Sequence, residues 1–289
     1  MLRINSFGGL SVERDGRPLA GAAAQPRRMA ILALLARADE RGVTRDRVMS
    51  LLWPDMDEER ARRALTQALY ALRQDLGDDE AIAGVKELRL DLERISTDLH
   101  EFRRAKSRDS LDDAAAAYRG PFLDGFHLPG ADEFERWADQ ERRGLAREHA
   151  ELVERLAFLA EKRGDFSSAV GWWRRLAAID PLSARVAVSL MRALAASGDA
   201  HAAIQHARVH EVLLEQELEL PADREVAAFA AQLRSEARRQ SAESRASAPN
   251  QRVGAELPEG VVAAREPAAT AALVSPPPSL GAAADAPTA

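Results

Sequence analysis

The chain has 289 residues and a net charge of -6 with a pI of about 5.7, so no overall positive field marks a nucleic-acid-binding protein, and any basic surface must be local. It contains no cysteine, which excludes thiol catalysis, thiolate metal sites and disulfide bonds. The longest apolar run, Met29 to Ala36, is far shorter than the ~20 residues that span a bilayer, and the N-terminus lacks the apolar stretch of a signal peptide. We therefore expect a soluble cytoplasmic protein, and the length favours about two domains.

The first 60 residues change from a strand pattern to a helix pattern. Residues 2–12 alternate apolar and polar side chains, and Asp15-Gly16 is a strong hairpin signal, which together predict a small antiparallel sheet. From Pro26 the apolar residues follow a period of 3.6, typical of a helix. Thr44 is suited to cap a second short helix, which Pro54 prevents from continuing.

A third predicted helix, about Asp57 to Leu76, carries an apolar face and a polar, basic face. Between Arg60 and Arg73 it contains four arginines and no acid, whereas a face that only keeps an acidic protein soluble would be expected to include glutamate. Thr, Gln and Arg side chains can hydrogen-bond to base edges, and Arg can also neutralise phosphates. The alternative is an ordinary solvated face; the composition favours a DNA-contacting one.

A second hairpin is predicted after this helix, around Ile82 and over residues 88–90, with the polar turn Gly84-Val85-Lys86-Glu87 between its strands. A sheet, three helices and a hairpin make a winged helix, whose third helix enters the major groove while the wing touches the flanking backbone or minor groove. The candidate DNA-binding residues are Arg60, Arg62, Arg63, Thr66, Gln67, Tyr70 and Arg73 on the helix, with Arg47, Lys86 and Arg89 as phosphate contacts.

The following segment contains an internal repeat. Gly164-Asp165 recurs as Gly198-Asp199 after 34 residues, the tetratricopeptide period. Pro181 ends the second helix of the first repeat, whereas the equivalent position of the second repeat is Glu215. Further helices are predicted at about 98–106, 111–119, 131–163 and 223–239. Stacked helix pairs form concave surfaces for partners, although a plain helical spacer remains the alternative.

The last 49 residues, Ser241 to Ala289, contain no aromatic residue and seven of the fourteen prolines. Such a segment buries too little apolar surface to offset its chain entropy, so we expect it to be disordered. The predicted fold is thus mainly α. A winged helix with small antiparallel sheets (1–96) precedes an all-α, tetratricopeptide-like domain (97–240) and a disordered Ala/Pro-rich tail (241–289).

Several strings carry a family resemblance. "RRMAILALLA", "VTRDRVMSLLWPDMDEERARRALTQALYALRQDLGDD" and "STDLHEFRRA", followed by "YRGPFLDGF" and "EFERWADQERRGL", resemble the Streptomyces antibiotic regulatory proteins over about 240 residues. That resemblance implies an OmpR/PhoB-type winged helix followed by a bacterial transcriptional activator domain. It implies that Arg63, Thr66, Gln67 and Tyr70 contact double-stranded promoter DNA, and that the protein activates transcription by recruiting RNA polymerase. It also favours a homodimer on directly repeated half-sites.

Other functions have weaker support. His206 and His210 are spaced as zinc ligands can be, but no third ligand follows at a recognisable spacing, so we expect no metal. We find no nucleophile and base that would indicate an enzyme and no phosphate-binding loop, so we expect no catalytic residues and no cofactor. The main alternative to a sequence-specific DNA-binding regulator is a tetratricopeptide-type scaffold whose winged helix binds protein instead of DNA.

Overall fold

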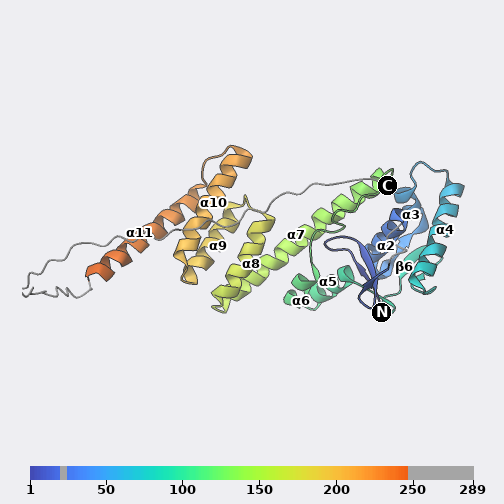
Figure 1. Ribbon diagram of the computed structural model, residues 1–289, viewed down its shortest axis with the longest axis horizontal. Helices are drawn as coiled ribbons and strands as arrows, with labels where there is room; N and C mark the ends of the chain where they lie inside the picture. The colour runs from blue at the N-terminus through green and yellow to red at the C-terminus, as the bar shows by residue number, and fades with distance from the viewer. Residues whose placement is uncertain (20–24, 247–289) are drawn as a thin grey trace, which may run out of the picture. The chain divides into compact units, whose positions relative to one another are not determined.

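The computed structural model describes residues 1–19 and 25–246, apart from the side chains of Asp39 and residues 244–246 (Figure 1). In these ranges the protein is mainly helical, with small sheets confined to the first hundred residues, as the sequence predicts. The expected disordered tail lies almost entirely outside the described residues. Its first six residues differ from the expectation, because the last helix continues through Ala246.

The first sheet has four strands in the order β3-β2-β1-β7. β1 (Leu2–Asn5), β2 (Ser11–Arg14) and β3 (Arg17–Pro18) are antiparallel neighbours, and left-handed φ angles at Asp15 and Gly16 (51° and 75°) form the predicted hairpin turn. β7 (Ile95–Thr97) lies parallel to β1, an arrangement that the expectation of a purely antiparallel sheet missed. A pairing between strands some 90 residues apart leaves no local pattern in the sequence.

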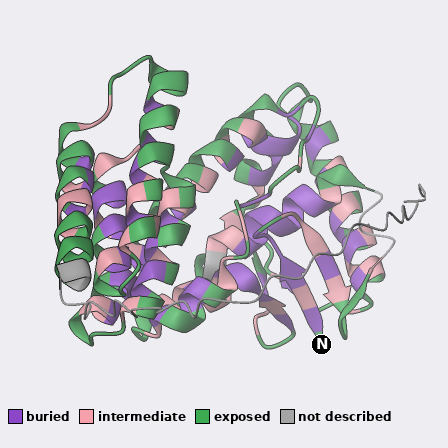
Figure 2. Cartoon of the chain, turned by 60° about the vertical axis from the view of Figure 1, so that its left-hand side comes forward, coloured by how far each residue is buried: buried purple, intermediate pink, exposed green. Residues whose placement is uncertain are grey.

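Three helices pack over a common core (Figure 2). They are α2 (Pro26–Ala38), which is followed by the short 3-10 helix η1 (Asp39–Arg41), α3 (Arg45–Leu52) and α4 (Glu58–Leu76). The side chain of Asp57 accepts a hydrogen bond from the Arg60 amide at 2.9 Å and caps the start of α4, whereas Gly77 ends it in the left-handed region. These caps and the buried apolar face fix the position and rotation of α4.

The wing is a three-stranded antiparallel sheet in the order β4-β6-β5, formed by β4 (Val43–Thr44), β5 (Ile82–Ala83) and β6 (Glu87–Leu90). Its turn needs glycine at position 84. The φ angle there is +101°, and a Cβ atom would lie 1.8 Å from the Glu87 carbonyl oxygen. The turn therefore holds a close backbone approach that no other residue permits.

α5 (Asp98–Ser107) and α6 (Leu111–Ala117) connect the winged helix to the helical repeats. The expected boundary after residue 96 falls inside β7, and the Asp98 carboxylate is hydrogen-bonded to the segment after β1. Phe7 also forms an isolated antiparallel bridge with Phe122. The two halves of the chain thus share a continuous buried core.

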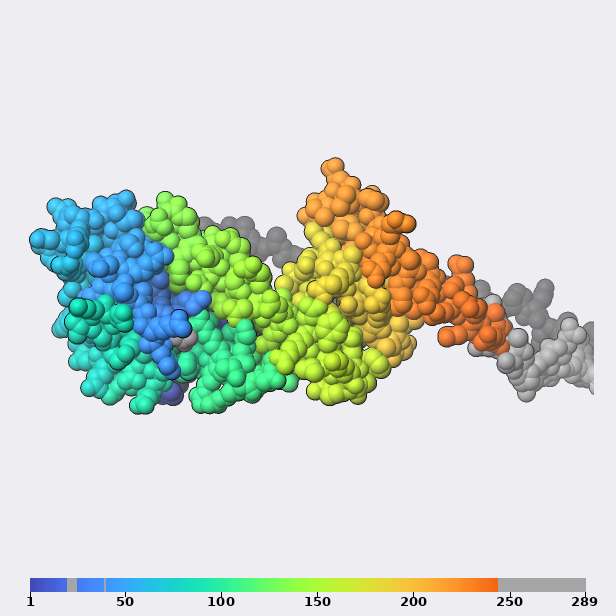
Figure 3. Space-filling view, turned by 180° about the vertical axis from the view of Figure 1, so that it is seen from behind, coloured from blue at the N-terminus to red at the C-terminus, as the bar shows by residue number. Residues whose placement is uncertain are grey.

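The second half consists of α7 (Asp132–Lys162), α8 (Phe166–Ile179), α9 (Ala184–Ala196), α10 (Ala200–Leu218) and α11 (Arg224–Ala246). The 34-residue repeat is structural: Asp165 caps α8 by accepting from the Ser168 amide, and Asp199 caps α10 by accepting from the Ala202 amide. α7 is a single long helix that contacts α3 near its start and α8 near its end (Figures 1 and 3).

The two repeats differ at Pro181 and Glu215, and this difference changes where their helices end, as predicted. α8 ends two residues before this proline, whereas α10, with Glu215 at the equivalent position, continues to Leu218. Among the described helices, none combines the length and the apolar composition needed to cross a membrane.

Candidate nucleic-acid interface

α4 presents two unlike faces. Leu65, Leu69 and Leu72 are buried against the core, whereas the opposite face is exposed, including Tyr70 with 66% of its surface accessible. The exposed predicted residues of this helix are Arg60, Arg62, Arg63, Thr66, Gln67 and Tyr70. In the described part of the chain the side chains of Gln67 and Tyr70 make no hydrogen bond. The face therefore offers amide and hydroxyl groups that are free to bond a ligand.

The three arginines in the first half of the face are paired with acids. Arg60 lies 3.2 Å from Asp57, Arg62 2.5 Å from Glu58, and Arg63 3.3 Å from Glu59, in each case one turn earlier. These arginines of the acid-free stretch are thus paired with the three acids that directly precede this stretch in the sequence. All six side chains are more than half exposed, so each pair contributes only ~0 to 1 kcal/mol and can exchange its partner readily.

Thr66 is less available than the sequence suggests. Its hydroxyl donates a hydrogen bond to the Arg62 carbonyl oxygen at 2.8 Å, a common contact of threonine inside helices. The hydroxyl proton is therefore occupied, while the oxygen and the methyl group remain exposed. An apolar contact, as with a thymine methyl group, suits this side chain better than hydrogen-bond donation.

Arg73 differs from the other predicted helix residues. It is only half-exposed, and its guanidinium donates to the Ile82 carbonyl oxygen at 2.9 Å, while its Nε is buried. This contact within the protein engages part of the guanidinium, and a phosphate contact of Arg73 stays a prediction. Arg73 thus links the helix to the wing.

The wing tip is held beside the start of α3. The Arg45 side chain donates from Nε to the Val85 carbonyl oxygen at 2.6 Å, and the Arg45 amide donates to the Lys86 carbonyl oxygen at 3.1 Å. The side chains of Lys86 and Arg89 remain exposed on the wing. Sequence reasoning missed Arg45, whose only signal is a basic residue at the N-terminus of a helix, where a carboxylate is usual.

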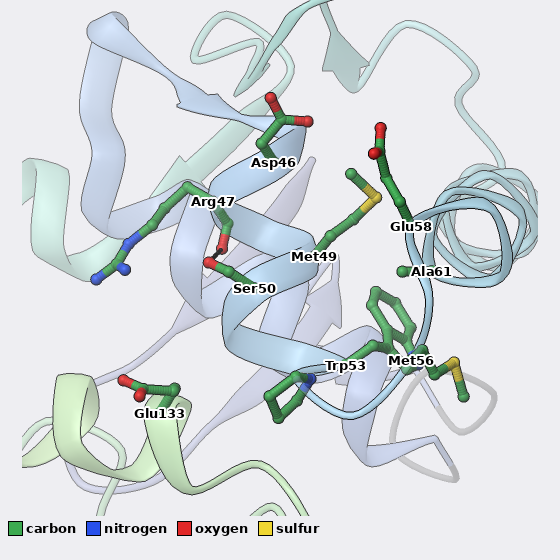
Figure 4. A pocket seen from close by; sticks show the side chains of 10 residues that line it. Asp46, Arg47, Met49, Ser50, Trp53, Met56, Glu58, Ala61 and Glu133 are labelled. Atoms are coloured by element: carbon green, nitrogen blue, oxygen red, sulfur yellow. Dashed lines mark hydrogen bonds between the residues drawn. The ribbon is translucent and has the colours of Figure 1, made fainter.

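Arg47 is exposed but lies apart from this group. Figure 4 shows its guanidinium directed away from α4, whose residues Glu58 and Ala61 lie across a groove of about 740 Å³. The apolar part of the groove is formed by Met49, Trp53 and Met56, and Glu133 at the start of α7 closes the other side. The structure therefore places Arg47 on the side of α3 that faces α7.

The two histidines considered as metal ligands are enclosed in the repeats. His210 is 1% exposed and its Nε2 lies 3.3 Å from the Leu182 carbonyl oxygen. Burial, together with the nearby His210 and Arg174, lowers the pKa of His206. Within the described residues no group of three or more histidine or carboxylate side chains is arranged to hold a metal ion.

A winged helix followed by helix-pair repeats, with an exposed polar face on the third helix, defines a DNA-binding transcription regulator. The family described as "Transcriptional regulatory protein, C terminal" matches residues 21–89, and the family described as "Bacterial transcriptional activator domain" matches residues 88–234. The chain belongs to the bacterial transcriptional activator domain family. Its domain order is that of the Streptomyces antibiotic regulatory proteins, and both matched domains are transcription-regulator domains, not enzymes.

A similar solved structure is that of "Mycobacterium tuberculosis EmbR in complex with low affinity phosphopeptide". The two are 20% identical, with a TM-score of 0.57, and the match covers 85% of this chain and 69% of that chain. At this identity the likeness concerns the fold. No curated protein sequence matches the chain.

Proposed function

We propose that this transcription regulator binds promoter DNA in a sequence-specific manner, with α4 in the major groove and the wing on the neighbouring backbone. The observation that carries the proposal is the exposed pair Gln67 and Tyr70, at the middle of a helix fixed by its caps and by its buried leucines. The Gln67 amide can donate and accept at once, which suits an adenine edge.

Arg60, Arg62 and Arg63 support binding by exchanging partners. When DNA approaches, each guanidinium leaves an exposed carboxylate and takes a phosphate oxygen, which is a closely similar ligand. Lys86 and Arg89 supply phosphate contacts from the wing, together with Arg45 near its tip. Arg47 takes no part in the DNA contact because it faces α7, and Arg73 supports the wing.

A titration of the full chain with promoter fragments from its own genomic neighbourhood, repeated at several salt concentrations, tests this proposal. We expect tight binding to one fragment, weaker binding to a scrambled duplex, and a linear fall of log affinity with log salt. Equal affinity for every duplex would contradict sequence-specific binding. No DNA affinity at all would leave the tetratricopeptide-type scaffold as the better function.

We further propose that the bound protein activates transcription by recruiting RNA polymerase, which the matched activator domain supports. A reconstituted reaction with polymerase and the bound promoter tests this step. Transcript should increase with the wild-type protein and fall to the basal amount with Gln67→Ala. Promoter binding with no increase in transcript would contradict recruitment.

The third part of the proposal is a homodimer on DNA. One helix contacts few base pairs, so two protomers on half-sites about one DNA turn, or ~10 bp, apart would explain high specificity. Inserting about five base pairs between half-sites places the second on the opposite face of the duplex. Cooperative binding should then disappear, and its survival would contradict the dimer.

A further inference from the structure

A second basic surface lies away from α4, at the junction of the two halves of the chain. A groove of about 560 Å³ is lined by two segments: η1 on one side and one face of α5 on the other. From α5 come His100, Arg103, Arg104 and Ser107, which follow the i, i+3, i+4, i+7 spacing of a single helix face. From η1 come Arg41 and one acid, Glu40.

Three arginines surrounding one groove repel one another, so their placement needs an explanation. Arg103 has one, because it donates to the Arg37 carbonyl oxygen at 3.0 Å and so satisfies the C-terminal end of α2. Arg41 and Arg104 have no ion pair and no side-chain hydrogen bond within the described ranges. The C-terminal end of α2 therefore explains the position of Arg103, but not those of Arg41 and Arg104.

Neighbouring basic side chains at the same junction are neutralised. Arg3 makes a bidentate contact with Glu101 at 2.6 and 2.7 Å, and Arg37 lies 2.5 Å from Glu141. Both acids of α5 are thus engaged outside the groove, Glu101 with Arg3 and Asp98 with the segment after β1. The positive charge left without a partner is concentrated where the surface is concave.

We propose that this groove binds a phosphate group, held by Arg41 and Arg104 from opposite sides. Guanidinium groups are well suited to phosphate because their paired N–H groups match its oxygens. The volume of the groove is that of a small-molecule site. A concave site of this size favours a free polyphosphate compound, such as a nucleotide, over the phosphate backbone of a DNA duplex. A ligand here would tie η1 of the winged helix to α5 of the activator domain.

The test is a calorimetric titration of the full chain with tripolyphosphate at constant ionic strength. We expect saturable binding, with the Kd at least tenfold higher in Arg41→Ala and in Arg104→Ala. Arg163→Ala is the matched control, since Arg163 is an exposed arginine at the end of α7, and it should bind like the wild type. Both test side chains are exposed and make no ion pair or hydrogen bond in the described part of the chain, so circular dichroism and Tm should remain those of the wild type.

A second arm distinguishes the source of the phosphate, and this arm alone depends on the proposed DNA binding. If the groove holds a DNA phosphate, Arg104→Ala lowers the salt slope of promoter binding by about one and tripolyphosphate does not bind. If it holds a free compound, the slope is unchanged. The proposal is overturned if tripolyphosphate binding is absent and the slope is unchanged, or if both variants bind tripolyphosphate like the wild type. If the protein binds no DNA, the proposed function fails, but the tripolyphosphate titration still tests the phosphate site.

Discussion

Asp98 and Ser6 are joined by two hydrogen bonds inside the protein. The carboxylate of Asp98 accepts from the Ser6 amide and from the Ser6 hydroxyl, both at 2.7 Å, and the Phe7 amide donates to the same carboxylate at 2.8 Å. Both residues are almost completely buried, and burial raises the pKa of Asp98. The first residue of α5 is thus bonded to the segment that follows β1, and the winged helix and the activator domain share this contact.

Asp98→Ala should lower the free energy of unfolding by about 2 to 4 kcal/mol, because two backbone amides and a hydroxyl lose a buried acceptor. Urea denaturation measures the effect. Glu133→Ala is the control: it removes an exposed ion pair with Arg136 and should cost less than ~1 kcal/mol. Equal costs for the two variants would contradict a structural role of Asp98.

Gln67→Ala should lower the affinity for the cognate duplex by about 1 to 3 kcal/mol, while binding to a scrambled duplex and its salt dependence stay unchanged. The reason is that an amide contact to a base edge depends on sequence and carries no charge. Gln205→Ala, the same substitution on the exposed surface of α10, should leave both affinities unchanged. If Gln67→Ala also binds cognate DNA like the wild type, α4 is not the recognition helix.

Glu59→Gln should raise the affinity for cognate and scrambled duplexes alike, by several-fold at low salt. The substitution removes the acid 3.3 Å from Arg63 and so leaves one more positive charge for a phosphate. Fluorescence anisotropy across a salt series measures both affinity and slope. Glu225→Gln, which removes the acid paired with Arg192 in the repeats, is the control and should change neither. A fall in affinity would show that the acid itself supports binding.

Arg73→Ala distinguishes a wing support from a phosphate contact. Loss of the hydrogen bond to the Ile82 carbonyl oxygen should speed amide exchange in β5 and lower the Tm by a few degrees, since a bond to a charged donor contributes about 1.5 to 3 kcal/mol. The salt slope of DNA binding should stay the same. A slope lower by about one, with unchanged exchange in β5, would instead restore Arg73 as a phosphate contact.

His149 should make the fold sensitive to acid. It stacks on Tyr118 with ring centroids 4.0 Å apart, and burial, with Arg175 nearby, lowers its pKa to about 4. Because this pKa lies below the unfolded value of 6.5, the stabilisation is fully present above pH 6.5 and is lost as pH falls toward 4. After discounting for partial exposure, the loss should be about 1 to 2 kcal/mol.

The measurement for His149 is Tm between pH 7 and pH 4.5. His149→Phe keeps a stacked ring without a titrating group, so its Tm should fall less over this range than that of the wild type. The Tm of the variant should still depend on pH, though less than that of the wild type, because the pKa of His206 is also lowered. Identical pH profiles for both proteins would show that His149 remains solvated.

Local signals in the sequence were sufficient for much of this architecture. The leucine spacing predicted α4, the turn at Gly84 predicted the wing, and the recurrence of Gly164-Asp165 predicted the helical repeats, whose caps the structure then showed. Each of these features depends on hydrogen bonds or side-chain spacing within a few residues, and the strings that carry the family resemblance extend over the same segments.

Only the tertiary structure decided how those elements meet. The parallel pairing of β7 with β1, the contact of Arg73 with β5 and the orientation of Arg47 toward α7 all join segments that are separate in the sequence. A local pattern shows that an arginine lies on a polar face, but not whether a neighbouring strand carbonyl lies close enough to bond it. That depends on how buried faces far apart in the chain pack together, because packing sets which polar groups come within hydrogen-bond distance.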